Sequence, residues 1–315
     1  MAEAPLDPEH LAAAAALKAR GLLPVSPMTA PIAEARAAVD RISAFLGEGS
    51  VPLAGERDVA VPGRGGPVRC RFYPAATVGA PVLVYAHGGS FAVGGLDAWD
   101  HVMRDLVRQS GAAALHVDYR MMPEHRFPAA PEDMLAAARW VATQAGTLGV
   151  DPARFALGGD SAGANLALGT AQVLRDEDGP QPRFLLLHYG AYSTEYDSPS
   201  WHRFGGGEYG LSRASAAWLW ENYLTAPEQR QDPRAAPLLG EMRGLPPALL
   251  TIGSHDPLLD EQHALAGKLR MAGVPCRLIE YPGLTHGFIR QARLVGKVRQ
   301  AIADSAAALR EAFAH

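Results

Sequence analysis

The sequence predicts an α/β protein with one mostly parallel central sheet and helices on both faces of that sheet. Two observations carry this prediction. Short, continuously apolar segments such as 82–86 alternate with longer helix-like segments along most of the 315 residues, a rhythm typical of parallel strands that are covered on both faces. The 33 glycines and 25 prolines are more than an all-helical bundle needs, and they indicate many tight connections between strands and helices.

The overall composition excludes several classes of protein. Hydrophobic residues make up 48% of the chain and charged residues 20%, with 29 basic against 33 acidic side chains and a net charge of −4. These values are ordinary for a globular protein and argue against a disordered or fibrous chain. They also give no sign of a nucleic-acid surface or a polybasic membrane anchor. We therefore expect no nucleic-acid partner and no membrane association.

Targeting signals and cysteines point to the cytoplasm. The apolar run 11–17 is short and alanine-rich and follows the acidic Asp7 and Glu9, whereas a signal peptide needs basic residues before a more apolar core. No apolar segment approaches the roughly 20 residues of a membrane span. Cys70 and Cys276 are the only cysteines, and we predict two buried, reduced thiols rather than a disulfide framework.

The elements follow in order along the chain. The first fifty residues read as helices broken at 21–27, and the segments 56–61 and 67–73 read as an antiparallel hairpin around a glycine-rich turn. Strands and helices then alternate. The expected strands are 82–86, 112–117, 155–157, 184–187, 248–252 and 276–280, and the expected helices are 97–110, 129–146, 162–175, 258–272 and 291–313.

One segment interrupts this alternation. Residues 192–225 are rich in Tyr, Ser, Trp and Gly and end in a helix expected at 213–224. The segment is longer than a plain crossover between two strands requires. We interpret it as an insertion that covers part of the molecule.

Ser161 is the candidate nucleophile. It is the centre of a G-x-S-x-G pentapeptide at 159–163, after the strand 155–157 and at the start of a helix. Small flanking residues are needed where a serine occupies a sharp, strained turn between a strand and a helix. The helix N-terminus behind such a serine offers free N–H groups to a developing oxyanion.

A serine hydroxyl needs a base, and the base needs an acid that orients it. His286 lies on the loop after the last strand, and Asp256 lies on the loop after the strand 248–252. We therefore predict the catalytic triad Ser161, Asp256 and His286. Asp260, four residues after Asp256, is the alternative acid, although it is expected one turn into the following helix.

The loop 87–90, His-Gly-Gly-Ser, follows the central strand 82–86 and is the candidate oxyanion hole. Two consecutive glycines allow the backbone N–H groups to face a substrate carbonyl. We predict three donors: the N–H groups of Gly88, Gly89 and Ala162. Removing one comparable donor costs on the order of 10²–10³ in rate.

These motifs together resemble the hormone-sensitive-lipase-like family of α/β-hydrolases, which includes bacterial acetyl esterases and carboxylesterases. The resemblance covers roughly 82–288 and rests on motifs in the same order: the HGG-S loop, Asp118-Tyr119-Arg120 with Pro123-Glu124-His125 and Phe127-Pro128-Ala129, the GDSAG turn, the Asp-Pro-Leu acid and the His-Gly-Phe histidine. One departure is Ser90, where the family usually has a third glycine. The resemblance associates activity on bulky tertiary-alcohol esters with the three-glycine loop, so we do not expect that activity here.

The resemblance implies an α/β-hydrolase catalytic domain over 51–315 and a helical cap built from 1–50 and the insertion 192–225. It also implies a small-molecule ester as substrate and a homodimer. Four aromatic side chains near motif ends or in the insertion are candidates for lining the substrate pocket: Phe91, Tyr192, Trp218 and Phe288.

The function predicted from the sequence is therefore hydrolysis of short- to medium-chain carboxylic esters through an acyl-enzyme, with no cofactor and no metal. The same machinery could act on an amide, carbamate or lactone. A ligand-binding receptor with an inactive site would lack a triad member, and an interfacial lipase would have a more apolar lid than 192–225. The glycine-rich 205–210 matches G-x-G-x-x-G but lacks the preceding strand that a dinucleotide site needs.

Overall fold

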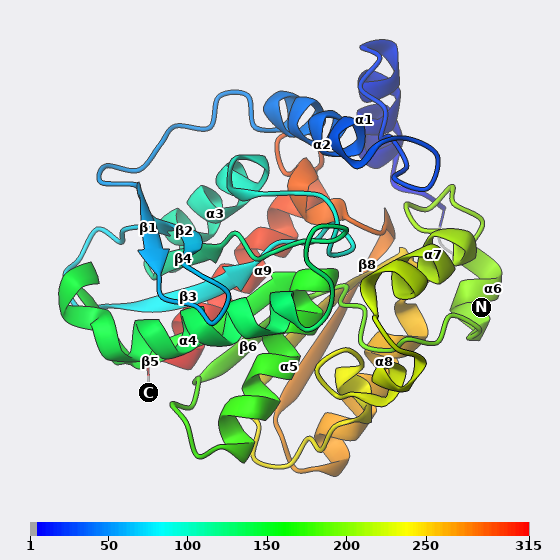
Figure 1. The fold of residues 1–315 in the computed structure, drawn as a ribbon. Coiled ribbons are helices and arrows are strands. Elements are labelled where there is room, and N and C mark those ends of the chain that lie inside the picture. Colours follow the sequence, from blue (N-terminus) through cyan, green and yellow to red (C-terminus); the bar gives the residue numbers. More distant parts are fainter. Residues whose placement is uncertain (1–4, 315) are drawn as a thin grey trace.

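The computed structural model describes residues 5–314 and contains a central sheet with helices on both sides (Figure 1). The strand order is β1-β2-β4-β3-β5-β6-β7-β8. The first two strands form the predicted antiparallel hairpin, β2 is antiparallel to β4, and all later pairings are parallel. The strands are β1 Arg57–Val61, β2 Val68–Tyr73, β3 Ala80–Ala86, β4 Ala113–Val117, β5 Val150–Asp160, β6 Phe184–His188, β7 Ala248–His255 and β8 Cys276–Thr285.

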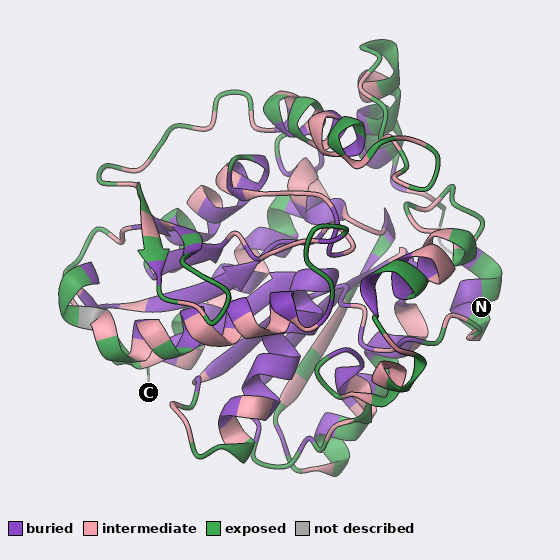
Figure 2. Ribbon diagram, in the orientation of Figure 1, coloured by how far each residue is buried: buried purple, intermediate pink, exposed green. Residues whose placement is uncertain are grey.

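Side chains that alternate along the strands build two separate cores. On β3, Val82 and Val84 join the core on one face, whereas Leu83 and Tyr85 join the core on the other. Helices α4 (Ala129–Leu148), α5 (Ala162–Asp176) and α8 (Leu259–Met271) supply side chains to the first core; α3 (Leu96–Ser110) and α9 (Gly296–Phe313) supply them to the second. Figure 2 shows the sheet largely buried between helices whose outer faces are exposed. This agrees with the continuously apolar strands in the sequence.

The predicted element types are confirmed, and the differences lie at their ends. Strand β5 begins at Val150, earlier than the expected start at 155. Helix α9 begins at Gly296, later than expected, because Phe288–Gln291 form a short 3₁₀ helix first. No helix in the described part of the chain is both long enough and apolar enough to span a bilayer.

The N-terminal helices α1 (Pro8–Ala19) and α2 (Ile32–Leu46) lie together at the top of the view in Figure 1. Asp7 caps α1 by accepting hydrogen bonds from the backbone of Glu9 and His10, which satisfies N–H groups that have no partner inside the helix. The His10 ring then lies 3.0 Å from the Thr285 hydroxyl at the end of β8. Helix α1 is thereby joined to the end of the last strand, β8.

The segment between β6 and β7 contains α6 (Pro199–Phe204), α7 (Arg213–Tyr223) and two short 3₁₀ helices, Pro227–Gln231 and Pro237–Leu239. Ser212 begins α7 with a reciprocal pair of hydrogen bonds to Ser215, the arrangement of a capping box. The predicted helix at 213–224 is confirmed.

Both cysteines are free thiols. Cys70 is buried in β2, as predicted. Cys276 is only half-buried, because it begins β8 at the edge of the sheet. The prediction of two buried thiols is therefore wrong for Cys276.

Candidate active site

Ser161 occupies a strained turn between β5 and α5. Its φ of 53° and ψ of −116° lie in a region that residues with a side chain rarely adopt. A Cβ on Gly159 would lie 2.3 Å from the carbonyl carbon of Gly163, and a Cβ on Gly163 would lie 1.9 Å from the oxygen of Ala86. Both positions therefore need glycine, which is the physical reason for the small flanking residues in the pentapeptide.

The three residues predicted as a triad are brought together in one chain of hydrogen bonds. Ser161 Oγ lies 2.9 Å from Nε2 of His286, and Nδ1 of the same ring lies 2.9 Å from Oδ2 of Asp256. Asp256 is completely buried, and its other oxygen accepts the backbone N–H of Leu258 at 2.9 Å. The carboxylate is thus held in place from one side and faces the imidazole with the other.

Asp260, the alternative acid, has another role in the structure. Its Oδ2 accepts the backbone N–H of Ser200 at 2.7 Å, at the start of α6. It therefore anchors the inserted segment, whereas Asp256 provides the hydrogen bond to His286.

The loop that carries His286 is supported by the inserted segment. The backbone N–H of His286 donates to the carbonyl of Tyr209 at 3.1 Å. The next residue, Gly210, has a φ of 98°, and a Cβ there would lie 3.0 Å from the His286 oxygen. The glycine-rich 205–210 is thus a close contact of His286, a role that the sequence pattern did not indicate.

The structure corrects one predicted oxyanion donor. The N–H of Gly88 already donates to Oδ1 of Asp160 at 3.0 Å, so it is not free to face a substrate. The N–H groups of Gly89, Ser90 and Ala162 have no acceptor in the described part of the chain. Gly89 and Ser90 both have positive φ, 116° and 54°, because the loop reverses sharply after β3.

A small cavity of about 30 Å³ lies beside Ser161. The inserted segment and the loops after β3, β6 and β7 supply most of its lining. The lining residues are Ser90, Phe91, Ser161, Ala162, Ala191, Ser193, Trp201, Leu211, Ser215, Ala216, Leu219, Trp220, Leu258 and Glu261.

Of the four aromatic side chains expected in the pocket, only Phe91 lines this cavity. The ring of Tyr192 is fully buried and packs so closely on the backbone that a Cβ on Gly190 would meet it at 2.3 Å. Phe288 is also fully buried, with its ring 4.9 Å from that of Tyr189. Trp218 is partly buried against the first core and does not line the cavity. The predictions for Tyr192, Trp218 and Phe288 are therefore wrong for this cavity.

Several of the lining residues that the sequence interpretation missed come from one face of α7. Ala216, Leu219 and Trp220 all line the cavity, at the i, i+3 and i+4 spacing that places side chains on one helix face. That spacing is the signal in the sequence that distinguishes Trp220 from Trp218.

Glu261 is an acidic residue in the cavity wall. Burial raises the pKa of its carboxyl group to about 8, against the opposing effect of its hydrogen bonds. One oxygen accepts the backbone N–H groups of Tyr192 and Ser193 at 2.7 and 3.0 Å. Glu261 therefore fixes the loop after β6 that forms one side of the cavity.

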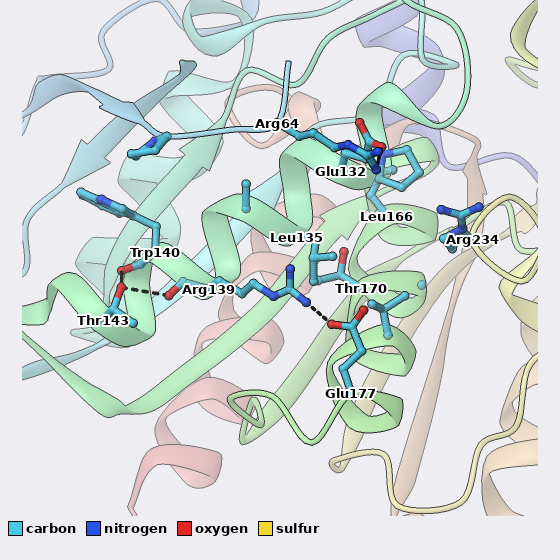
Figure 3. A pocket seen from close by; sticks show the side chains of 15 residues that line it. Arg64, Glu132, Leu135, Arg139, Trp140, Thr143, Leu166, Thr170, Glu177 and Arg234 are labelled. Atoms are coloured by element: carbon cyan, nitrogen blue, oxygen red, sulfur yellow. Dashed lines mark hydrogen bonds and ion pairs between the residues drawn. The ribbon is translucent and has the colours of Figure 1, made fainter. Parts of the chain in front are cut away.

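A much larger cavity, about 660 Å³, lies elsewhere, between α4 and α5 (Figure 3). An ion pair between Arg139 and Glu177 crosses its rim. None of the three triad candidates lines it. Size alone thus does not locate the chemistry of this molecule, and no group of three or more His, Cys, Asp or Glu residues in the described range is arranged to hold a metal ion.

Comparison with known proteins identifies relatives over most of the chain. A family model described as "alpha/beta hydrolase fold" matches residues 83–290, more than half of the chain. An ethyl acetate hydrolase of Pseudomonas putida is 37% identical over 231 residues, 73% of this chain and 72% of that protein. Carboxylesterase NlhH of Mycobacterium tuberculosis is 36% identical over 250 residues, 78% of each protein.

Solved structures agree with this relationship. A hyperthermophilic esterase from the archaeon Pyrobaculum calidifontis superposes with a TM-score of 0.91 at 36% identity, covering 98% of each chain. An ester hydrolase from the metagenome of Lake Arreo, solved with a bipyridine phosphonate derivative, also gives a TM-score of 0.91, at 35% identity over 98% of this chain and 100% of that chain.

Proposed function

The chain belongs to the hormone-sensitive-lipase-like family of α/β-hydrolases and is a serine carboxylic ester hydrolase, and we propose that Ser161, His286 and Asp256 are its catalytic triad. The observation that carries the proposal is the pair of 2.9 Å contacts from Ser161 through His286 to a fully buried Asp256. This is the arrangement that activates a serine hydroxyl by general base catalysis.

The reaction proceeds in two half-reactions. Nε2 of His286 takes the proton of the Ser161 hydroxyl while Oγ attacks the ester carbonyl carbon, and the same proton passes to the leaving alcohol as the tetrahedral intermediate collapses. Water, deprotonated by His286, then attacks the carbonyl carbon of the acyl-enzyme. The bond from that carbon to Ser161 Oγ breaks, Oγ takes the proton back from His286, and the carboxylic acid is released. Asp256 holds the imidazole in the tautomer that accepts at Nε2 and stabilises the imidazolium without taking its proton.

The oxyanion donors we propose are the N–H groups of Gly89, Ser90 and Ala162. Ser90 and Ala162 line the same cavity as Ser161, and all three N–H groups lack an acceptor in the described residues. Ser90 donates through its backbone, so the absence of a third glycine leaves this donor intact. Donors fixed before the reaction stabilise the negative charge that develops on the carbonyl oxygen.

The substrates we propose are esters with a short to medium acyl chain. The cavity beside Ser161 is small, and bulky side chains such as Leu219 and Trp220 form its wall, so a small acyl group fits it with the least rearrangement. The relative from Pseudomonas putida, an ethyl acetate hydrolase, supports the same substrate class.

We also propose that 1–50 and 192–225 act together as a cap over a catalytic domain formed by 51–315. The inserted part supplies Trp201, Leu219 and Trp220 to the cavity. The N-terminal part contacts the loops of the site from outside: Arg36 donates to the carbonyl of Ala92 at 2.9 Å, directly after the oxyanion loop.

Replacement of the nucleophile tests the function. Ser161→Ala is expected to abolish hydrolysis of 4-nitrophenyl acetate and to prevent labelling by a serine-directed phosphonate, because no other hydroxyl contacts His286 in the described residues. The wild type should be labelled with a stoichiometry of one. A Ser161→Ala protein with wild-type turnover would assign the nucleophile elsewhere. Ser254→Ala is a suitable control, since that hydroxyl bonds to His255.

The assembly and location that we propose are a homodimer and the cytoplasm. Light scattering after size-exclusion chromatography measures the mass of the particle, for which two chains of 33.4 kDa are expected. Fractionation of the source cells tests the location.

A further inference from the structure

Asp160, the residue before the nucleophile, lies at a point where several parts of the site meet. It ends β5 and is 2% exposed. Its Oδ1 accepts three hydrogen bonds, from the Tyr85 hydroxyl at 3.0 Å, the Gly88 N–H at 3.0 Å and the Trp99 indole at 2.9 Å. Three donors on one carboxylate oxygen saturate it and fix the carboxylate plane.

The first consequence concerns the oxyanion loop. The bond from Gly88 to Asp160 ties the loop directly to the residue beside Ser161. The contact leaves no free space, because a Cβ on Gly88 would lie 2.5 Å from Oδ2 of Asp160 and 3.2 Å from Cβ of Ser161. The positions of the next two N–H groups, those of Gly89 and Ser90, therefore depend on this anchor.

The second consequence concerns the base. Oδ2 of Asp160 accepts the hydroxyl of Tyr189 at 3.3 Å. The Tyr189 ring packs edge-on against the His286 imidazole, with 5.0 Å between ring centroids, and its hydroxyl also accepts the N–H of Ile289 at 3.3 Å. The same carboxylate thus orients a ring that supports the catalytic histidine.

Neutral hydrogen-bond donors and the positive charge of Arg290 both stabilise the charge on this carboxylate. Burial raises the pKa of Asp160 to about 6, with the bonds from Tyr85, Gly88 and Trp99 and the charge of Arg290 acting in the opposite direction. The group is therefore ionised at neutral pH, and hydrogen bonds to an ionised acceptor are stronger than those to a neutral one. The guanidinium of Arg290 lies over the Trp99 ring, 4.4 Å from its centroid, rather than on the carboxylate.

We propose that Asp160 is a positioning residue of the reaction, which holds the oxyanion loop and the His286 imidazole in register with Ser161. The proposal rests on the proposed function and adds to it a residue that touches neither the substrate nor the reacting atoms. Misplacement of catalytic groups by about 1 Å can cost on the order of 10²-fold in rate. Loss of this anchor should therefore lower kcat while leaving KM nearly unchanged.

The test compares Asp160→Asn with the wild type on 4-nitrophenyl acetate. An amide keeps the shape of the side chain but lacks the charge, so kcat is expected to fall about tenfold with KM within about twofold. Asp133→Asn is the matched control, because Asp133, on α4, is equally buried but pairs with Arg120 in the loop after β4. The control should lose folding stability without a comparable loss of kcat per folded molecule.

A second variant decides the matter if Asp160→Asn does not fold. Tyr189→Phe removes only the hydroxyl that bonds to Asp160 and should lower kcat several-fold with an unchanged KM. Wild-type kcat in the folded variants, or a loss of kcat in Asp133→Asn as large as in Asp160→Asn, would overturn the proposal. A wild-type protein that does not turn over the ester would instead refute the function on which the proposal rests.

Discussion

At the scale of single residues, the site depends on which carboxylate faces the imidazole. Asp256 and Asp260 are four positions apart, yet only Asp256 contacts His286, and the other accepts the backbone of Ser200. The difference arises because Asp256 belongs to the turn after β7, whereas Asp260 lies in the first turn of α8. The two residues therefore form a natural pair of test and control.

Asp256→Asn is expected to lower kcat by roughly 10⁴-fold, as the equivalent amide substitution does in a serine protease, because the amide favours the wrong imidazole tautomer. Asp260→Asn should retain most of the wild-type kcat. Steady-state kinetics on 4-nitrophenyl acetate measure both. A large loss in Asp260→Asn combined with a small loss in Asp256→Asn would exchange the two roles.

At the scale of elements, helix α7 determines how much room the acyl group has. Leu219 is 8% exposed and shares the small cavity with Ser161. Shortening it to alanine removes three carbon atoms from the cavity wall. Because each additional buried methylene of a substrate contributes about 0.8 kcal/mol, the enlarged cavity favours longer acyl chains.

Leu219→Ala is thus expected to raise the ratio of kcat/KM for the 4-nitrophenyl octanoate over the acetate on the order of tenfold. Leu245→Ala is the control, since Leu245 is similarly buried but does not line the cavity. Both variants should lose about 2–5 kcal/mol of folding stability. An unchanged ratio in Leu219→Ala would mean that α7 does not limit the acyl chain.

The elements also show how far the sequence alone leads. Strands such as β3 and the turn around Ser161 were predictable, because their local patterns follow directly from burial and from steric limits on the backbone. The hydrogen bond from the Gly88 N–H to Asp160 was not predictable. The direction of that N–H depends on the two positive-φ residues that follow it and on the position of the Asp160 carboxylate. Trp220, by contrast, shares the helical spacing of Ala216 and Leu219, which Trp218 does not, but the sequence does not say that this face of α7 turns toward Ser161.

At the scale of the whole molecule, the N-terminal helices and the catalytic loops are connected through α3. Nε2 of His101 on α3 donates a hydrogen bond at 2.9 Å to the carbonyl of Arg290, and the guanidinium of Arg290 donates to the hydroxyl of Ser43 on α2. The carbonyl can only accept, so Nε2 of His101 is the donor. These contacts join α2, α3 and the segment just after His286 into one unit.

This connection predicts a specific dependence of stability on pH. Burial lowers the pKa of His101 to about 4, against about 6.5 in an unfolded chain. Between these values the unfolded chain binds a proton that the folded protein does not. The contribution of His101 is therefore fully present above pH 6.5 and is lost as the pH falls towards 4, by up to roughly 3 kcal/mol in total.

His101→Gln keeps a donor for the Arg290 carbonyl but has no titratable group. The difference in unfolding free energy between the wild type and this variant therefore contains the pH dependence of His101, because the contributions of the other ionisable groups cancel. Urea unfolding at pH 7.5, 6.0 and 5.0 should show the wild type losing stability relative to the variant at each step. The slope should approach 1.4 kcal/mol per pH unit below pH 6. If the unfolding free energies of His101→Gln and the wild type changed in parallel with pH, the histidine would bind a proton equally well in the folded and unfolded states. The contact between α3 and the segment after His286 would then not exclude the charged form of His101.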